Sequence, residues 1–433
     1  MAELVWRGKG RARRPRVRPL RTDEIHGETH GVGGWQNRLV HGEAEWVLPG
    51  LRGELAGRVA LVYVDPPFDT GGAFDYLATI PGAPDGTPRV AVPAYADARG
   101  LDPWLAWFHA TATHLHALLA DGGSLYVHLD AHAAHYAKVL LDEVFGADAF
   151  QREIVWRIGW VSGFKSRVRG WIRNHDTLLF YAKGGRPATF HKEYVPYPPD
   201  YVRRDGAKPT GPGYPIEDVW NASELDRMDS IQIMSFSGEK VGYPTQKNES
   251  LVSRVMRASS SPGDLVLDCC AGSGTTPVVA EKLGRRWVAC DASPVAIHAT
   301  RKRLLGMPEV GAFVVQRAGE AAKASGKVGA VVVVDGRTCT LELESFAPLA
   351  RAIPADVRSV VTHWSQWLEG WCVDWEHEGG PLRAGARVWR HCGKLALSTT
   401  HTYARPGRYT ALVKVFDVLG GEATRAVRVD VKG

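Results

Sequence analysis

Cysteine is scarce in this sequence, and the cysteines that occur are not spaced for a metal or redox site. No two of them form a C-x-x-C pair, and half lie in apolar, strand-like segments; the six are Cys269, Cys270, Cys290, Cys339, Cys372 and Cys392. Structural zinc sites and thiol redox motifs use close pairs, and disulfide frameworks belong to small secreted domains. We therefore expect neither a disulfide scaffold nor a bound metal.

Long apolar runs are also missing. No uninterrupted hydrophobic segment approaches the roughly 20 residues that a membrane helix needs. The first residues carry charge where a signal peptide has an apolar region, so we expect a cytoplasmic protein with no membrane partner. With 433 residues, 45% of them hydrophobic, the chain has enough apolar material for one large domain and a smaller one.

Acidic residues are absent from one segment near the N-terminus. Eight of residues 7–21 are lysine or arginine and none is aspartate or glutamate, while the whole chain has a net charge of only +6. Such a segment suits contacts to phosphates, and it suits a solubilising tail equally well. We predict a flexible basic arm over residues 1–22.

Beyond this arm, strand patterns alternate with helical patterns, which favours a layered α/β sheet. Strands are expected at 58–65, 123–130, 175–184, 263–270 and 285–291, and helices at 102–120, 134–146, 248–259, 275–284 and 293–305. We expect this α/β domain to cover residues 23–308.

The alternation fails in two places. Between residues 184 and 243, proline and glycine multiply and tyrosines alternate with arginine and lysine, which favours an irregular recognition insert. After about residue 310 the sequence becomes rich in strand patterns. We predict a separate all-β sandwich over residues 328–433, with the domain boundary inside 308–328.

One short segment of the α/β part, "YVDPPFDTGG", places an acid directly after an apolar strand. The strand would deliver Asp65 to the edge of a sheet, where Pro66 and Pro67 stop regular pairing and stiffen the backbone. Asp65 and Phe68 would then stand on a rigid turn. Taken alone, the segment fits a stiff strand exit with a satisfied carboxylate as well as it fits a binding site.

A second segment, "LVLDCCAGSGTTPVVAEKLGRRWVACD", has the layout of a nucleoside site. A strand ends at Asp268, a turn with Gly272 and Gly274 leads into a helix, and the next strand ends at Asp291. Glycines let backbone amides approach a ligand at a helix N-terminus, and an acid about 20 residues later can bind ribose hydroxyls. Pro277 replaces the third glycine of a dinucleotide motif, and no P-loop lysine follows.

Together with "YPTQKNESLVSRVMRASSSPGDLVLDCCAGSGTT", these motifs resemble those of the DNA amino-methyltransferases that use S-adenosylmethionine. Their order, with the target-amine motif before the cofactor motif, is similar to the permuted β class. The likeness covers residues 35–305 and is greatest to the Mod subunits of type III restriction-modification systems. It implies a Rossmann-like methyltransferase sheet, S-adenosylmethionine as cofactor and double-stranded DNA as partner. It leaves open a homodimer and an accompanying restriction subunit.

The resemblance also implies roles for individual residues. The target base would be held by Asp65, Pro66, Pro67 and Phe68. The cofactor would be held by Glu43, Thr245, Lys247, Asp268, Cys269, Gly272, Gly274, Thr275 and Asp291, with Asp268 at the methionine portion, Asp291 at the ribose and Glu43 near the adenine ring. The chain departs from the family where D-P-F becomes Asp-Cys-Cys and T-Q-K-P becomes Thr-Gln-Lys-Asn.

The exocyclic amine of adenine is a poor nucleophile because its lone pair is delocalised into the ring. If Asp65 and the carbonyl of Pro66 accept its two hydrogens, the lone pair can aim at the methyl group. Cytosine C5 methylation needs a nucleophilic cysteine, commonly after proline, and no such dipeptide occurs. We predict an adenine-N6 methyltransferase, because cytosine-N4 enzymes of this family more often carry serine in place of Asp65. A cytosine-N4 enzyme and a non-catalytic DNA-binding protein of the same fold are the alternatives.

Aromatic and basic side chains interleave over residues 156–173, a mixture that suits phosphate contacts and base stacking as well as a structural cluster edged with charge. The aromatic residues are Trp156, Trp160, Phe164 and Trp171, and the basic ones are Arg157, Lys165, Arg167, Arg169 and Arg173. At the other end of the chain, residues 401–431 resemble the end of a PKD-type, immunoglobulin-like domain. No catalytic pattern is visible there, and we expect a stabilising appendage rather than a dimerisation, DNA-clamping or docking module.

Overall fold

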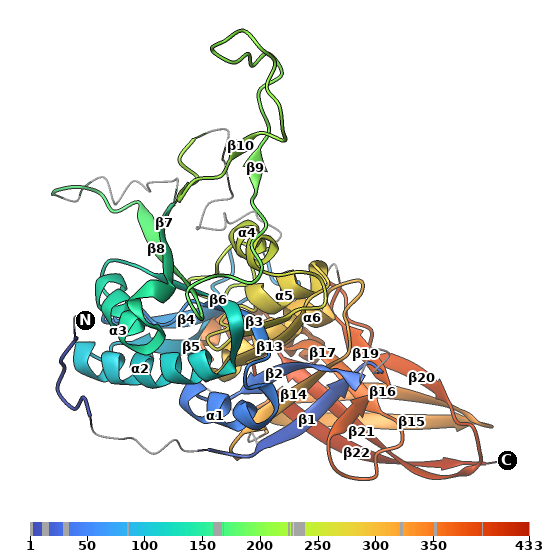
Figure 1. Cartoon of the computed structure of the whole chain (residues 1–433). Coiled ribbons are helices and arrows are strands. Elements are labelled where there is room, and N and C mark those ends of the chain that lie inside the picture. The colour runs from blue at the N-terminus through green and yellow to red at the C-terminus, as the bar shows by residue number, and fades with distance from the viewer. Residues whose placement is uncertain are drawn as a thin grey trace.

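The computed structural model describes residues 3–10, 17–28, 34–84, 86–158, 167, 169–223, 226, 228, 239–320, 324–349, 353–391 and 393–432 (Figure 1). The helices are α1 (Ala44–Leu55), α2 (Leu101–Leu118), α3 (Ala134–Phe145), α4 (Glu249–Ser259), α5 (Thr275–Lys282), α6 (Pro294–Leu305) and α7 (Ala355–Val360). The first strands are β1 (Leu20–His26), β2 (Asn37–His41), β3 (Val59–Val64), β4 (Gly72–Ala78), β5 (Val90–Asp97), β6 (Leu119–Leu129), β7 (Phe150–Arg157), β8 (His175–Ala182), β9 (Tyr194–Val195), β10 (Tyr214–Pro215), β11 (Val219–Trp220), β12 (Leu265–Asp268), β13 (Arg286–Asp291) and β14 (Phe313–Ala318). The later strands are β15 (Gly326–Asp335), β16 (Thr338–Pro348), β17 (Leu368–Asp374), β18 (Leu382–Ala384), β19 (Ala386–Trp389), β20 (Ser398–Thr402), β21 (Gly407–Asp417) and β22 (Glu422–Val431).

An 11-stranded mixed sheet dominates the N-terminal part, in the order β11-β7-β8-β6-β3-β12-β13-β2-β14-β1-β18. Its six central strands, from β6 to β14, run parallel. β12 lies directly beside β3, although the whole segment from β4 to α4 separates the two in sequence. The predicted α/β sheet is confirmed, and the strand of the first motif precedes the strands of the second, as in the permuted order.

Helices cover both faces of this sheet. Alternate side chains of β3 enter opposite cores: Val62 and Val64 pack with residues of α1, α2 and α3, whereas Leu61 and Tyr63 pack with residues of α4, α5 and α6. A strand that is buried on both faces has no polar side to show to water, and it therefore reads as a continuous apolar run. This is the physical reason for the sequence "VALVYV" before Asp65.

The N-terminal segment differs from the predicted flexible arm over residues 1–22. Trp6 is buried against the core of α2 and α3, and the Lys9 ammonium pairs with the Glu143 carboxylate at 2.7 Å. Leu20 already begins β1, which pairs with β14. An indole gains free energy on burial in proportion to its large apolar area, and this holds the described start of the segment on the domain despite its positive charge.

The insert predicted over residues 184–243 divides into two portions. One portion, which includes the short β9–β10 hairpin, projects away from the sheet beyond α4 (Figure 1). The other returns to the sheet, where β11 pairs with β7 and Trp220 is buried. The recognition role of the projecting portion stays a prediction.

The C-terminal part contains two antiparallel sheets, β15-β16-β20 and β19-β17-β21-β22. Most of their buried side chains, among them Leu341, Trp371 and Val413, belong to one core, while Cys372 and Phe416 belong to a second, small cluster with Leu382. The helix α7 and a short 3-10 helix (Trp364–Trp367) lie between β16 and β17 in the chain, so this part is not purely β. The likeness to a PKD-type domain stays a prediction.

The chain passes from the large sheet to the first C-terminal sheet between residues 318 and 326, and the predicted domain boundary inside 308–328 stays a prediction. β14 ends at Ala318 and still belongs to the large sheet, while β15 begins at Gly326 in the first C-terminal sheet. The large sheet thus extends beyond residue 308, the end that we predicted for the α/β domain. The short β18 pairs with β1, so a C-terminal strand also extends the large sheet.

Candidate active site

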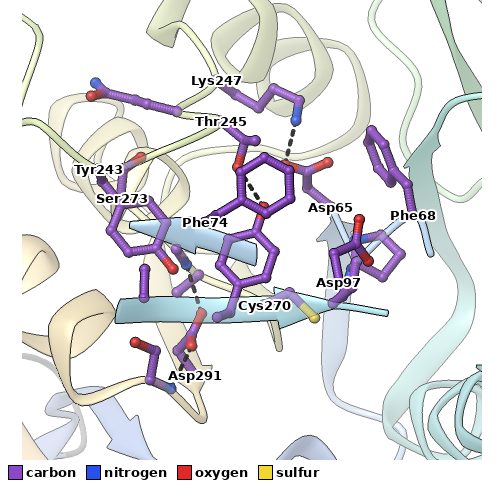
Figure 2. Close-up of a pocket in the computed structure, with 18 of the residues that line it drawn as sticks. Asp65, Phe68, Phe74, Asp97, Tyr243, Thr245, Lys247, Cys270, Ser273 and Asp291 are labelled. Carbon is purple, nitrogen blue, oxygen red and sulfur yellow. Dashed lines mark hydrogen bonds and ion pairs between the residues drawn. The ribbon is translucent and has the colours of Figure 1, made fainter. Parts of the chain in front are cut away.

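Five acidic residues gather at one edge of the large sheet. They lie at or just after the carboxyl ends of the neighbouring parallel strands β6, β3, β12, β13 and β2, in the order Asp130, Asp65, Asp268, Asp291 and Glu43. Ligands of open α/β sheets bind outside the carboxyl ends of the strands. All five residues line one cavity of about 680 Å³, a volume suited to a small-molecule site. Figure 2 shows two of them, Asp65 and Asp291, on the cavity wall.

The turn after β3, which we call the target-amine turn (residues 65–70), is fixed by its prolines and by the helix beside it. Pro66 and Pro67 lack an N–H for pairing, and the Pro67 carbonyl accepts a hydrogen bond from Trp104 Nε1 at 2.6 Å. Phe68 lies on the cavity wall. Asp65 Oδ1 is buried and has no hydrogen-bond partner within the described part of the chain. The turn therefore offers the cavity an aromatic face and an unused acceptor.

Lys247 lies between the two predicted halves of the site. Its Nζ is 2.5 Å from Asp65 Oδ2 and 5.2 Å from the centroid of the Phe68 ring. Figure 2 marks the contact between Lys247 and Asp65 with a dashed line. Its backbone carbonyl accepts a hydrogen bond of 2.9 Å from Thr275 Oγ1, at the start of α5. The structure thus places the ammonium on the target side, where the sequence did not expect it. The cofactor role predicted for Lys247 stays a prediction.

Asp97, the last residue of β5, holds the end of the target-amine turn. Its carboxylate accepts hydrogen bonds from the backbone N–H of Asp69 at 2.7 Å, from the N–H of Thr70 at 3.1 Å and from the Thr70 hydroxyl at 2.7 Å. The N–H of Gly71 donates to the Asp97 carbonyl at 2.7 Å. Asp69 has a φ of 60°, a strained conformation that these bonds maintain.

The turn after β12 brings the backbone close to the space where a ligand would lie. Gly272 and Gly274 have φ values of 50° and 78°, and a Cβ atom at Gly274 would come within 2.6 Å of Thr300 Oγ1. Only glycine fits there, because both the conformation and the packing exclude a side chain. Thr275 begins α5 directly afterwards, so this turn presents a helix N-terminus to the cavity.

Asp268 is buried and accepts hydrogen bonds inside the turn that it begins. Its Oδ1 takes the N–H of Cys270 at 2.9 Å and its Oδ2 takes the hydroxyl of Thr276 at 2.6 Å. Burial raises the pKa of Asp268 to about 7 against the effect of these donors. Cys269 is buried at the cavity, and although its hydrogen bond with Cys270 opposes the shift, burial raises the pKa of the Cys269 thiol. The hydrogen bond with Cys269, together with burial, raises the pKa of the Cys270 thiol well above its usual value. Both thiols are therefore poor nucleophiles.

Asp291 lies at the end of β13 and is held by backbone donors. The N–H of Gly272 reaches its Oδ2 at 2.8 Å, and the N–H of Ser293 reaches its Oδ1 at 2.8 Å. Burial, with the nearby charge of Glu43, raises the pKa of Asp291 to about 6. Glu43 occupies the N-cap position of α1, where its side chain makes no capping hydrogen bond to the described residues of the helix, and it lines the same cavity. The structure thus brings together Asp291, the predicted ribose acid, and Glu43, the predicted adenine-ring acid.

Two tyrosines that the sequence did not single out form the opposite wall. The rings of Tyr95 and Tyr243 are stacked with centroids 6.5 Å apart, and Phe74 stacks on Tyr95 at 5.0 Å. The Tyr95 hydroxyl lies 3.0 Å from the hydroxyl of Thr245, whose φ is 54°. Tyr95 and Phe74 come from the β4–β5 hairpin, which carries no recognisable motif. Nothing in their sequence pattern distinguishes them from ordinary strand residues.

A cluster of polar side chains lies at the target side of the cavity. Asp130 and Asp176 are both buried, and Arg173 pairs with both, at 3.5 Å from Asp130 Oδ2. His128 links Asp176 to the Tyr63 hydroxyl, with distances of 3.2 and 2.9 Å. Although burial opposes the shift, the hydrogen bond from His128 lowers the pKa of Asp176. Asp130 could have been found in the sequence, because it follows an apolar strand in the same way as Asp65.

The two described tryptophans of the mixed aromatic and basic stretch, residues 156–173, differ in burial. Trp156 is fully buried in the sheet, so for this residue the structural interpretation is confirmed. Trp171 is fully exposed, two residues before Arg173, which lines the cavity. Trp160 and Phe164 lie outside the described residues, and so does Lys165.

The residues around the cavity fit a nucleoside cofactor with a charged tail. The glycine turn gives close access to backbone N–H groups, the Tyr243 ring packs against Gly272, and Asp291 and Glu43 stand at adjacent strand ends. Carboxylates accept from ribose hydroxyls, and apolar walls pack against a purine. Within the described residues no group of three metal-ligating side chains is present, and no helix has the length and apolarity to cross a membrane.

Comparison with known proteins defines the class. The DNA methylase family of N6 and N4 methyltransferases matches residues 59–302, more than half of the chain, and the chain belongs to this family. The match confirms the predicted family, the DNA methylases, for which the sequence resemblance implied S-adenosylmethionine as cofactor. The family contains both adenine-N6 and cytosine-N4 enzymes, as its name states, and so does not decide between the two bases.

The individual relatives are similar to this chain over parts of their length. The Type II methyltransferase M1.MboII of Moraxella bovis is 34% identical over 155 residues, which are 33% of this chain and 57% of that protein. The DNA adenine methyltransferase YhdJ of Escherichia coli K12 is 25% identical over 61% of this chain and 82% of that protein. The structure of the M1.HpyAVI–SAM complex is similar with a TM-score of 0.40 and 18% identity, over 62% of this chain and 98% of that chain. The match thus spans little more than half the length of M1.MboII.

Proposed function

We propose that the protein transfers a methyl group to the N6 amine of adenine in double-stranded DNA. The observation that carries this proposal is the state of Asp65: its Oδ1 is buried at the cavity without a hydrogen-bond partner in the described residues, beside the aromatic face of Phe68. A buried acceptor without a donor costs free energy, which a bound amine would recover. An exocyclic amine is a donor of the right kind, and Phe68 supplies a stacking surface for its ring.

The residues of the target side then have defined tasks. Asp65 Oδ1 accepts one hydrogen of the amine and the Pro66 carbonyl accepts the other, which draws the nitrogen out of conjugation with the ring. The Lys247 ammonium holds the second oxygen of Asp65, at 2.5 Å, and so fixes the direction of the first. The rigid turn makes this arrangement available before the base arrives, and such preorganisation lowers the barrier.

The cofactor side is expected to hold S-adenosylmethionine through Asp291, Glu43 and the glycine turn, as the family resemblance implies. When it is bound, S-adenosylmethionine supplies an electrophilic methyl group. Asp268 fixes the glycine turn through its two hydrogen bonds to Cys270 and Thr276. Tyr95 and Tyr243 keep water from the wall of the cavity, which strengthens the hydrogen bonds inside it.

A base in a duplex cannot reach a buried carboxylate, so the proposal includes extrusion of the base at a cost of a few kcal/mol. Two exposed regions favour a DNA surface on this side of the molecule. The first is the exposed segment that carries Trp171, and the second is the projecting portion of the insert, where Tyr197 and Tyr201 stack at 5.1 Å near Arg203 and Arg204. Aromatic and cationic side chains of this kind contact bases and phosphates.

The test is methyl transfer from labelled S-adenosylmethionine to unmethylated duplex DNA, followed by mass analysis of the nucleosides. The expected product is N6-methyl-2′-deoxyadenosine with the natural chain, and it should form about 10²- to 10³-fold more slowly with Asp65→Ala. Asp65→Ser is the informative companion, because it retains an acceptor but has no charge, and we expect a rate between the other two. Methylcytosine as the sole product would overturn the choice of base. Cofactor binding without any product, across a random set of DNA sequences, would support the non-catalytic alternative.

A further inference from the structure

The C-terminal part was expected to be a stabilising appendage, but its contacts lead into the catalytic cavity. The connection runs through the β4–β5 hairpin, which is inserted between the target-amine turn and α2. The near end of this hairpin lines the cavity with Phe74 and Tyr95, which lie opposite each other across the two strands. The far end is buried in the core of the C-terminal part.

The far end contributes a compact apolar group to that core. Tyr76, Ala78, Ile80, Val90 and Val92 are all buried there, in the same cluster as side chains of β16, β17 and β21. A directional contact adds to this packing, because Gln366 Nε2 in the short 3-10 helix donates to the Pro81 carbonyl at the hairpin tip, at 2.9 Å. The hairpin is therefore held at its far end by residues of the C-terminal part.

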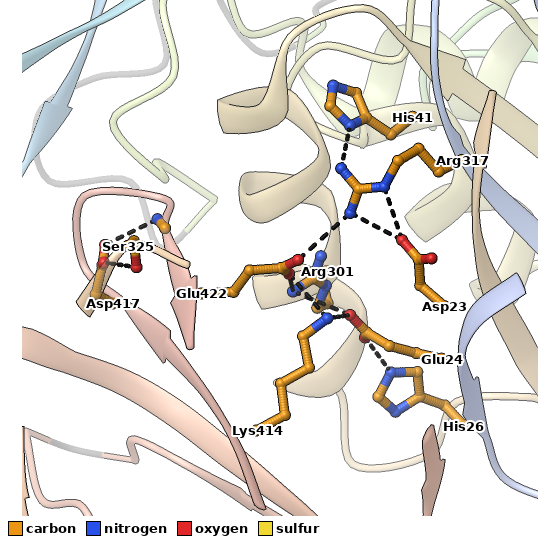
Figure 3. A network of polar contacts seen from close by, with 11 residues as sticks. Asp23, Glu24, His26, His41, Arg301, Arg317, Ser325, Lys414, Asp417 and Glu422 are labelled. Carbon is orange, nitrogen blue, oxygen red and sulfur yellow. Dashed lines mark hydrogen bonds and ion pairs between the residues drawn. The ribbon is translucent and has the colours of Figure 1, made fainter. Parts of the chain in front are cut away.

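The C-terminal part also packs against α6, the helix that follows Asp291. α6 begins three residues after Asp291, and Gly420, in the β21–β22 turn, lies against α6, where a Cβ atom at Gly420 would be in ordinary van der Waals contact with Val295 and His298 at 3.6 Å. Buried charges secure the contact, as Figure 3 shows: Lys414 lies 2.7 Å from Glu24 and 3.0 Å from Glu422. The network is completed by Arg301 of α6 and Arg317 of β14, both of which pair with Glu422.

The near end of the hairpin finishes at Asp97, whose carboxylate and carbonyl together take four hydrogen bonds from the backbone and side chain of residues 69–71. These bonds set the end of the turn that begins at Asp65. A continuous chain of contacts thus runs from Gln366 through Pro81 and the paired strands to Asp97, and from there to the target-amine turn.

We propose that the C-terminal part positions the target-amine turn, with the β4–β5 hairpin as the transmitting element and Asp97 and Gln366 as positioning residues. This inference rests on the proposed methyl transfer. It gives the C-terminal part a role in the catalytic rate. Asp268 and Asp291 take their hydrogen bonds from outside the hairpin, and the hairpin reaches the cofactor side through Tyr95, which contacts Tyr243 and Thr245. We therefore expect a change at Pro81 to alter the target-amine turn more than cofactor affinity.

The first test uses Gln366→Glu in the full chain. Glutamate keeps a carboxyl oxygen to accept from the N–H groups of Thr362 and His363, as Gln366 Oε1 does, but it replaces the donor to Pro81 with a second acceptor. We expect kcat to fall about fivefold to tenfold, the size of one lost hydrogen bond with added repulsion, while the cofactor dissociation constant changes less than twofold. Val333→Glu, which adds the same charge at an exposed position, is the control and should change neither.

Hydrogen exchange measures the proposed link without any turnover. In Gln366→Glu, the amides of residues 69–71 should exchange faster, whereas the amide of Gly272, which donates to Asp291, should keep its rate. This pattern would hold even if the protein failed to methylate DNA, so it separates the inference from the proposed function. Unchanged exchange at residues 69–71, or a uniform increase over the whole domain, would overturn the inference.

A second variant tests the other end of the link. Asp97→Asn retains the size of the side chain but turns one acceptor into a donor that faces backbone N–H groups. We expect a fall in kcat of at least tenfold, with the KM for cofactor nearly constant, because the change acts on the turn rather than on the cofactor side. A rise in the cofactor KM at constant kcat would assign Asp97 to cofactor binding and contradict the proposal.

Discussion

The two halves of the cavity differ in how their acids are used. Asp268 and Asp291 each accept hydrogen bonds at both carboxylate oxygens from the protein itself, and both lie in turns of fixed shape. Asp65 has one oxygen paired with the Lys247 ammonium and the other without a partner in the described residues. The cofactor side is thus complete without a ligand, and the target side is not. The free-energy cost of the buried Asp65 Oδ1, unpaired within the described part of the chain, can therefore be recovered when a substrate donates a hydrogen bond to it.

The largest effect is expected at Asp65. Asp65→Ala should reduce single-turnover methyl transfer by about 10²- to 10³-fold, the usual effect of removing one polar group that stabilises a transition state. Cofactor binding, measured by calorimetry, should change less than about threefold, because the carboxylate does not belong to the cofactor side. Equal losses in transfer and cofactor affinity would contradict the division of the cavity into two halves.

The next largest effect is expected at Gly274, in the turn after β12, where a side chain should lower the free energy of unfolding. Gly274→Ala places a Cβ atom within 2.6–2.8 Å of Thr300 at a φ of 78°, and we expect it to lower the free energy of unfolding by about 2–4 kcal/mol. Gly263→Ala is a matched control, since its φ is 85° but nothing lies within 4 Å of the new atom. The control should cost only the backbone strain of about 1–2 kcal/mol. Denaturant titration of the two variants measures the difference.

The pKa of Asp291, raised to about 6, predicts a pH dependence of cofactor binding. Ribose hydroxyls donate to the ionised carboxylate, so affinity should fall by about tenfold per pH unit at most as the pH drops below 6. The effect on stability has the opposite sign: a raised carboxyl pKa favours the folded state below the usual value of 3.8, and this contribution is lost as the pH rises through 6. In Asp291→Asn the step in affinity near pH 6 should be absent. An unchanged step would assign it to another group.

The smallest effect is expected outside the cavity, at Trp171, and the buried Trp156 of the same mixed stretch provides the contrast. Trp171→Ala should weaken binding to duplex DNA by about fivefold and leave the melting temperature unchanged, because the indole is exposed. Trp156→Ala removes a fully buried indole and should lower the free energy of unfolding by about 3–5 kcal/mol. Fluorescence anisotropy and thermal melting separate the two outcomes. Equal DNA affinity for Trp171→Ala and the natural chain would remove this residue from the DNA surface.

The sequence predicted those residues of the site that a short segment of the chain is enough to place. Asp65, Asp268 and Asp291 were found because each stands at the end of an apolar strand, and parallel strands bring such ends to one edge. Asp97 and Tyr95 were not found, since their roles arise from pairing across a hairpin and from contact with distant residues. The contact of Lys247 with Asp65 joins residues 182 positions apart, and no pattern along the chain contains it.

The buried carboxylate of Glu24 has a consequence for the order in which the chain can complete its structure during synthesis. Although burial opposes the shift, Arg301 and Lys414 hold the pKa of Glu24 well below its usual range, so the group is charged inside the protein. A nascent chain that has not yet produced Lys414 would have to bury this charge with only part of its compensation, at a substantial cost. The pairing of β1 with β14 is therefore fully stabilised only when β21, which carries Lys414, is also in place.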